Sequence, residues 1–159
     1  PPDPTSGPKE GTVDATISMT STVCTELSTN SVDFGNGRFG QTDVAGNPDI
    51  EVSNCGLDPV ALFARGTDAT APGASWDLVD DTSTCADTLG VDAYHLRLVD
   101  SETLDDTWGL GLTNTLLQSV DVGAVGSYGP RIDTACSGSS GAGQQMSMQI
   151  VFTATASEP

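Results

Sequence analysis

The stretch GTVDATISMTSTV, residues 11–23, decides the fold class of this chain. Its apolar side chains alternate with Thr, Ser and Asp and lie at Val13, Ala15, Ile17, Met19 and Val23. Successive side chains of a β-strand point to opposite faces, so this period of two predicts a strand with one buried and one exposed face. The stretch QQMSMQIVFTATA, residues 144–156, alternates in the same way near the other end of the sequence.

The composition extends this prediction to the whole chain. Its 159 residues are 36% hydrophobic and 5% aromatic, and they include 18 Gly and 9 Pro. Such a mixture favours short strands joined by turns, and the best helical candidate, residues 103–117, is interrupted by Gly109 and Gly111. We therefore predict an all-β fold: a single β-sandwich, Ig-like or jelly-roll-like, of about 7–9 strands.

The remaining strands are expected where apolar residues alternate between turn signals. Residues 35–37, Gly-Asn-Gly, predict a tight turn, and residues 123–143 read as a long excursion rich in Gly and Ser. The expected strands outside the two terminal stretches are residues 31–34, 50–53, 60–66, 76–79, 94–99 and 116–122.

Three regions follow from this division. Residues 1–10 form a Pro-rich N-terminal leader, residues 11–23 the first strand, and residues 24–159 the sandwich. The first residue is Pro1 rather than Met, which leads us to expect a processed, secreted protein. No hydrophobic run approaches the roughly 18 residues that span a bilayer, so no transmembrane segment is expected.

The four cysteines are Cys24, Cys55, Cys85 and Cys136. Their spacing matches no zinc or haem motif, and an even number in an all-β chain predicts two disulfides formed in an oxidising, extracellular compartment. Three pairings are possible. We favour Cys24 with Cys55 and Cys85 with Cys136, because each pair flanks segments that could lie side by side as strands.

The net charge limits the choice of partners. There are 22 Asp and Glu residues against five Lys and Arg, a formal net charge of −17. A chain this acidic repels phosphates and anionic lipids, so nucleic acid and membrane surfaces are not expected as partners. The acidity fits either a solubilising extracellular surface or adaptation to salt or divalent cations.

The sequence shows little that points to catalysis. The single histidine, His95, is expected at the surface or edge of a strand, and no Gly-x-Ser-x-Gly elbow accompanies it. No cofactor is expected, although calcium is a candidate because hard cations bind several carboxylates on a turning backbone. The calcium candidates are Asp77, Asp80, Asp81, Asp105 and Asp106.

Several short segments give the chain a family resemblance. They are SVDFG (31–35), IEVSN (50–54), LFARGTD (62–68), WDL (76–78) and YHLRL (94–98). This succession resembles secreted β-sandwich surface proteins, in particular TasA/camelysin-like matrix fibre subunits and archaeal bundling-pilus or thread subunits.

The resemblance implies that residues 11–23 are a donor strand, which leaves its own subunit and completes the sheet of the next. The predicted function is therefore a non-enzymatic subunit of an extracellular filament, whose partners are copies of itself. Two alternatives remain. In the first, the stretch is the first strand of a self-contained sandwich, paired with residues 144–156 of its own chain, and the protein is a monomeric surface adhesion or binding module for carbohydrate or protein. The second is a secreted hydrolase, which would require converging carboxylates in a cleft.

Overall fold

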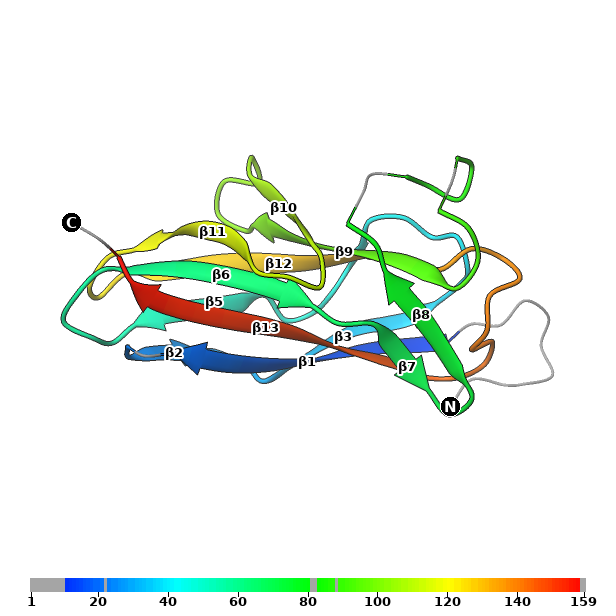
Figure 1. Cartoon of the computed structure of the whole chain (residues 1–159), viewed down its shortest axis with the longest axis horizontal. Helices are drawn as coiled ribbons and strands as arrows, with labels where there is room; N and C mark the ends of the chain where they lie inside the picture. Colours follow the sequence, from blue (N-terminus) through cyan, green and yellow to red (C-terminus); the bar gives the residue numbers. More distant parts are fainter. Residues whose placement is uncertain (1–10, 22, 81–82, 88, 158–159) are drawn as a thin grey trace.

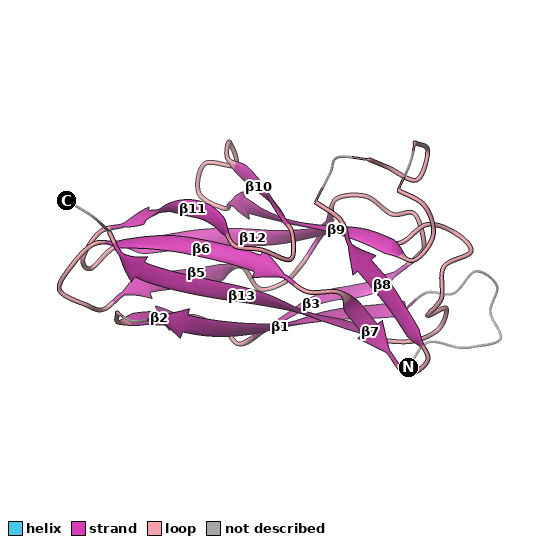
Figure 2. Ribbon diagram, viewed as in Figure 1, coloured by secondary structure: helices cyan, strands magenta, loops and turns pink. Residues whose placement is uncertain are grey.

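The computed structural model describes residues 11–21, 23–80, 83–87 and 89–157. Over these residues the chain is all-β, without a helix, and its strands form one curled open sheet (Figure 2). The strands are β1 (Gly11–Ser21), β2 (Thr25–Leu27), β3 (Ser31–Gly37), β4 (Val44–Ala45), β5 (Ile50–Asn54), β6 (Val60–Gly66), β7 (Ala69–Ala71), β8 (Ala74–Leu78), β9 (Ala93–Asp100), β10 (Thr107–Leu110), β11 (Thr115–Val120), β12 (Val125–Asp133) and β13 (Met146–Ala156).

The curl brings two halves of the sheet face to face. One half runs β11, β6, β13, β1 and β3, and the other runs β10, β9, β12, β5 and β2. The β7–β8 hairpin joins them, because β7 pairs with β13 and β8 pairs in parallel with β9. In Figure 1 the long strands β6, β13 and β1 run side by side along the length of the molecule.

The core lies between the two halves and follows the alternation in the sequence. On β6, Val60, Leu62 and Ala64 are buried while the residues between them are partly exposed. On β9, Tyr94, Leu96 and Leu98 are buried, as the alternation predicts. These side chains belong to one hydrophobic cluster that receives residues from strands of both halves, so the curled sheet encloses a single core.

The described residues form 13 strands, more than the seven to nine expected. Part of the difference comes from very short strands such as β2, β4 and β7, which have two or three residues and leave no alternation to detect. The best helical candidate, residues 103–117, contains the strand β10 and the start of β11, which agrees with its interruption by Gly109 and Gly111 and with the strand expected at residues 116–122.

The predicted loop over residues 123–143 is wrong in its first half, where β12 lies at the centre of one half of the sheet. Gly126, Gly129 and Pro130 disfavour a strand on propensity. Tertiary packing overrides that preference, because Tyr128 and Ile132 are fully buried in the core. The carbonyl of Pro130 still accepts a hydrogen bond from the Gly46 N–H, at 2.9 Å.

The tight turn predicted at residues 35–37 is also wrong, because these residues belong to β3. The register between β1 and β3 shifts there, so that β3 has one more residue than β1 between Thr12 and Asp14. Gly35 has a φ of 76°, a conformation that a glycine adopts without steric strain. The glycine thus makes a β-bulge within the strand.

Candidate assembly site

Strand β1 is paired along both of its edges. It runs parallel to β13, from Val13 opposite Met146 to Ser21 opposite Ala154. Its other edge pairs antiparallel with β3, from Gly11 opposite Gly37 to Thr16 opposite Ser31 (Figure 1). In the single chain, then, the strand pairs with β13 of its own fold. Removal of β1 would expose the backbone hydrogen-bonding groups of β13 and β3 as two free edges.

The apolar face of β1 is buried in the core. Val13, Ala15 and Ile17 are 4%, 1% and 7% exposed and belong to the central hydrophobic cluster. Val23 is partly buried against the same cluster, and the side chain of Met19 lies outside the described residues. Burial of a side chain the size of Val or Ile stabilises by about 1.5–3 kcal/mol, so Val13 and Ile17 anchor the strand.

The outer face of β1 carries a pair of facing carboxylates. Asp14 lies directly opposite Asp33 of β3. The Ile17 N–H donates to the Asn30 carbonyl at 3.2 Å, so by alternation the Asp14–Asp33 pair is not hydrogen-bonded through the backbone. Side chains of such pairs lie closer together than those of hydrogen-bonded pairs. The Gln145 amide also donates to the Asp14 carboxylate, which connects this pair to the start of β13.

The pKa of Asp14 is raised above its ordinary value of 3.8. Burial is the main cause, and the charge of Asp33 and a hydrogen bond shared with its carboxyl group add to it. No Lys or Arg of the described residues forms an ion pair with Asp14. Like charges directly opposite each other on neighbouring strands are destabilising, so charge on this pair opposes the docking of β1 against β3.

We expect the Asp14→Asn variant to hold β1 more tightly than the wild type at pH 7. Because the pKa of Asp14 is raised in the folded chain, protonation of its carboxyl group stabilises the docked strand. This stabilisation is complete below pH 3.8 and is lost as the pH rises through the pKa of Asp14 in the folded chain. The gain at pH 7 should be below about 1 kcal/mol, since Asp14 is partly exposed. Hydrogen exchange of the β1 amides between pH 3.5 and pH 7 measures it. The control is Asp105→Asn. If the protection of the β1 amides depended on pH in the same way in the Asp14→Asn variant and in the wild type, the expectation would be contradicted.

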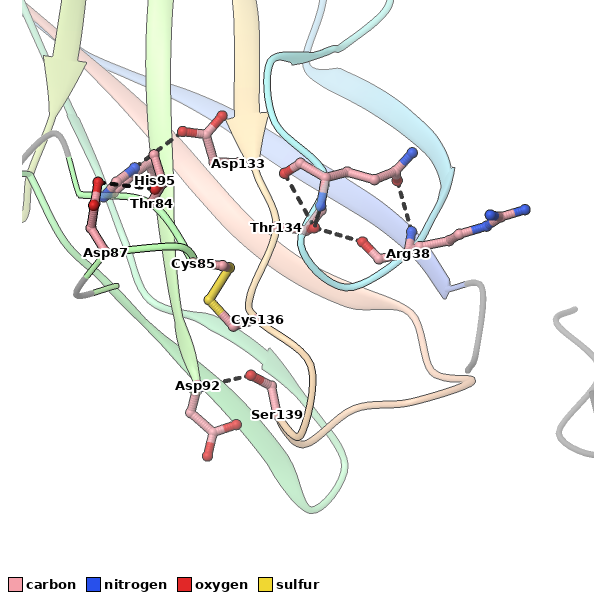
Figure 3. The surroundings of a disulfide bond; sticks show 11 residues. Arg38, Thr84, Cys85, Asp87, Asp92, His95, Asp133, Thr134, Cys136 and Ser139 are labelled. Carbon is pink, nitrogen blue, oxygen red and sulfur yellow. Dashed lines mark hydrogen bonds and ion pairs between the residues drawn. A yellow bond between two sulfur atoms is a disulfide. The ribbon is translucent and has the colours of Figure 1, made fainter. Parts of the chain in front are cut away.

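The first disulfide fixes the chain just after β1. Cys24 is bonded to Cys55, with Cα atoms 5.1 Å apart, and the Cys55 N–H donates to the Cys24 carbonyl at 3.1 Å. The second disulfide joins Cys85 to Cys136 (Figure 3). Both predicted pairings are confirmed. Cys24 lies three residues after Ser21, so the end of β1 is tied closely to the body of the fold.

A second polar group lies on the outer face of β9, beside the Cys85–Cys136 disulfide (Figure 3). His95 was expected at the surface or edge of its strand, and this is wrong: it is only 4% exposed. Its Nδ1 lies 3.1 Å from the Asp133 Oδ2, and Arg97 binds both Asp133 oxygens at 2.9 and 3.2 Å. Arg97 and Arg131 each contact Asp43 as well, at 3.2 and 3.1 Å.

The pKa of Asp133 is lowered below 3.8. Burial, the largest single influence, raises it, but the Asp43 N–H, His95 and Arg97 together favour the charged form more strongly. With both oxygens of Asp133 engaged, this cluster ties β9 and β12 to the segment that precedes β4. An open groove of about 750 Å³ lies over it, lined by these side chains and by Thr42, Thr84 and Thr107.

The calcium candidates are not gathered into one site. Asp77 is an exposed residue of β8, Asp80 borders the groove, and Asp105 and Asp106 lie in the turn before β10; Asp81 is outside the described residues. In the described part of the chain, no group of three or more His, Cys, Asp or Glu side chains is placed to hold a metal ion. The Asp14–Asp33 pair could not be predicted from the sequence, because it depends on the β1–β3 register.

Comparison with models of known protein families gives no match, and comparison with curated protein sequences gives none. The resemblance to matrix fibre and pilus subunits stays a prediction from the short segments of the sequence. In the described residues no helix has the length and apolar character needed to cross a membrane. Two disulfides are compatible with a secreted protein.

Proposed function

We propose that this chain is a non-enzymatic structural subunit of an extracellular filament and that it polymerises by exchanging β1 between copies. The observation that carries the proposal is the double pairing of β1, which lies between β13 and β3 with its apolar face in the core. The equivalent strand of a second copy would make the same backbone hydrogen bonds and fill the same apolar positions. Strand exchange would therefore replace contacts within one copy by the same contacts between two copies, so the interface needs few additional contacts.

Two features of the fold support this role. The two facing halves of the curled sheet would act as the two layers of a β-sandwich. We call the position between β13 and β3, which β1 fills, the slot, and the sandwich would stay compact around it. Cys24, which follows β1 after residues 22 and 23, is disulfide-bonded to Cys55, so the body of the fold remains cross-linked when β1 pairs with a neighbour. When each copy donates to one neighbour and accepts from another, the assembly does not close and grows into a filament.

The open groove beside His95 and Arg97 favours a second candidate. Threonine hydroxyls and charged side chains line it, and such convergent polar groups suit a hydroxyl-rich ligand such as a carbohydrate. In that case β1 would remain in its own fold and the protein would be a monomeric surface module that binds carbohydrate.

Electron microscopy of the unreduced protein at low and high salt tests the filament. The charge of −17 makes copies repel one another, and the screening length falls from about 10 Å at 0.1 M salt to about 3 Å at 1 M. We therefore expect regular filaments that become longer and more frequent at high salt. Isolated particles under every condition would contradict the proposal and favour the carbohydrate-binding module.

A further inference from the structure

The short connection after β1 restricts how two copies can meet. Ser21 ends β1, and Cys24, three residues later, is bonded to Cys55 next to the end of β5. Three residues span at most about 10 Å. The end of β1 is thus bound to one end of the molecule, where the β5–β6 loop and the β11–β12 turn also lie (Figure 1). We call this the hinge end.

Strand exchange must bring two hinge ends together. A donated β1 occupies the position of the acceptor's own β1, so the donated Ser21 lies at the acceptor's hinge end. The donor's Cys24 follows within about 10 Å, and with it the donor's own hinge end. Contact between like ends follows for a closed pair and for a growing filament alike. The β7–β8 hairpin lies at the opposite end of the molecule (Figure 1). In a filament the hinge ends would therefore gather along the axis, with the hairpins farther from it.

The hinge end carries exposed apolar side chains. Leu57 in the β5–β6 loop is 93% exposed, and Val122 and Val125, at the β11–β12 turn, are about half exposed. The two loops are held together, because the Gly123 N–H donates to the Asn54 carbonyl at 3.2 Å and the Asn54 N–H donates to the Ala124 carbonyl at 3.1 Å. Single exposed apolar residues are ordinary, but three of them on two loops at one end of the molecule favour contact with another surface.

We propose that this hinge-end surface, formed by Leu57, Val122 and Val125, is a contact surface between copies, and that in a filament it meets the same surface of the copy that donates β1 and of the copy that receives it. The proposal rests on the proposed exchange of β1, which brings these surfaces together. Asp58 and Asp121 flank the apolar side chains and are exposed. Their mutual repulsion across the contact is screened by salt, which agrees with the salt dependence expected for assembly.

The Leu57→Asp variant tests the contact. Because Leu57 is almost fully exposed, the variant should keep the unfolding temperature of the wild type while the mass fraction in assemblies, measured by light scattering at 1 M salt, falls at least tenfold. Val91→Asp is the matched control, since Val91 is exposed near the start of β9, away from the hinge end. It should assemble like the wild type. Leu57→Ser, which adds no charge, should give a smaller loss in the same direction.

The outcomes separate the two proposals. If the Leu57→Asp variant has the same mass fraction in assemblies as the wild type, the hinge-end contact is overturned, while the proposed exchange of β1 is not. An equal loss in Leu57→Asp and Val91→Asp also overturns it, because added charge at any place would then suffice. A wild type that stays monomeric at every salt concentration overturns the exchange of β1, and the hinge-end contact with it.

Discussion

Replacing Ile17 with Asp should release β1 from the sheet and abolish filaments. Ile17 is 7% exposed and lies in the core cluster between β13 and β3. Truncation of a buried Ile costs about 2–5 kcal/mol, and a carboxylate placed in the same apolar position adds a desolvation cost. We expect a loss of at least about 3 kcal/mol in the free energy that docks β1, in its own fold and in a neighbour's alike.

Hydrogen exchange of the β1 amides and electron microscopy measure this effect together. The control is Ser18→Asp, because Ser18 is the next residue along the strand and points to the exposed face. That variant should keep β1 protected and filaments intact. If the Ile17→Asp variant formed filaments and protected the β1 amides as the wild type does, Ile17 would not anchor the strand. The apolar face of β1 would then not be what holds it between β13 and β3.

The second large effect is expected at the cluster around His95. Asp133→Asn should lower the free energy of unfolding by about 3 kcal/mol, because it removes the charge that Arg97 and His95 contact on a buried carboxylate. Asp43→Asn is the matched control. The side chain of Asp43 is 62% exposed, so the loss there should stay below about 1 kcal/mol. Chemical denaturation at pH 7 measures both variants.

This effect should also depend on pH. The pKa of Asp133 is lowered in the folded chain, so its contribution is fully present above its ordinary pKa of 3.8 and is lost as the pH falls through the folded value. The difference in stability between wild type and Asp133→Asn should therefore shrink below pH 3.8. A difference below about 1 kcal/mol at pH 7 would show that the cluster does not hold β9 and β12 together.

Much of the fold could be predicted because alternation is a local property of the sequence. The strands at both ends of the chain and β9 show it plainly, and β6 buries its predicted run on one face. The β12 strand could not be found in this way, since Gly126, Gly129 and Pro130 hide the apolar pair Tyr128 and Ile132. Its position is decided by packing between distant strands, which local propensity does not encode.

The candidate site was predictable in part for the same reason. The alternation located the buried face of β1, at Val13, Ala15 and Ile17. The Asp14–Asp33 pair depends on a register shifted by the bulge at Gly35, and the hinge-end surface depends on two loops that lie far apart in the sequence. Burial of His95 likewise follows from its long-range partner Asp133. Each of these features arises from tertiary contacts rather than from a sequence pattern.

The most direct test of strand exchange is a cross-link between β1 and β3. Thr16 and Ser31 are exposed, lie directly opposite each other, and form a pair without backbone hydrogen bonds, which suits a disulfide. The Thr16→Cys/Ser31→Cys variant is assembled at high salt, oxidised and run on a denaturing gel without reductant, with Thr16→Cys alone as control. Exchange of β1 predicts a ladder of covalently linked chains from the double variant. A single band at the mass of one chain would show that β1 stays in its own fold and would contradict the account.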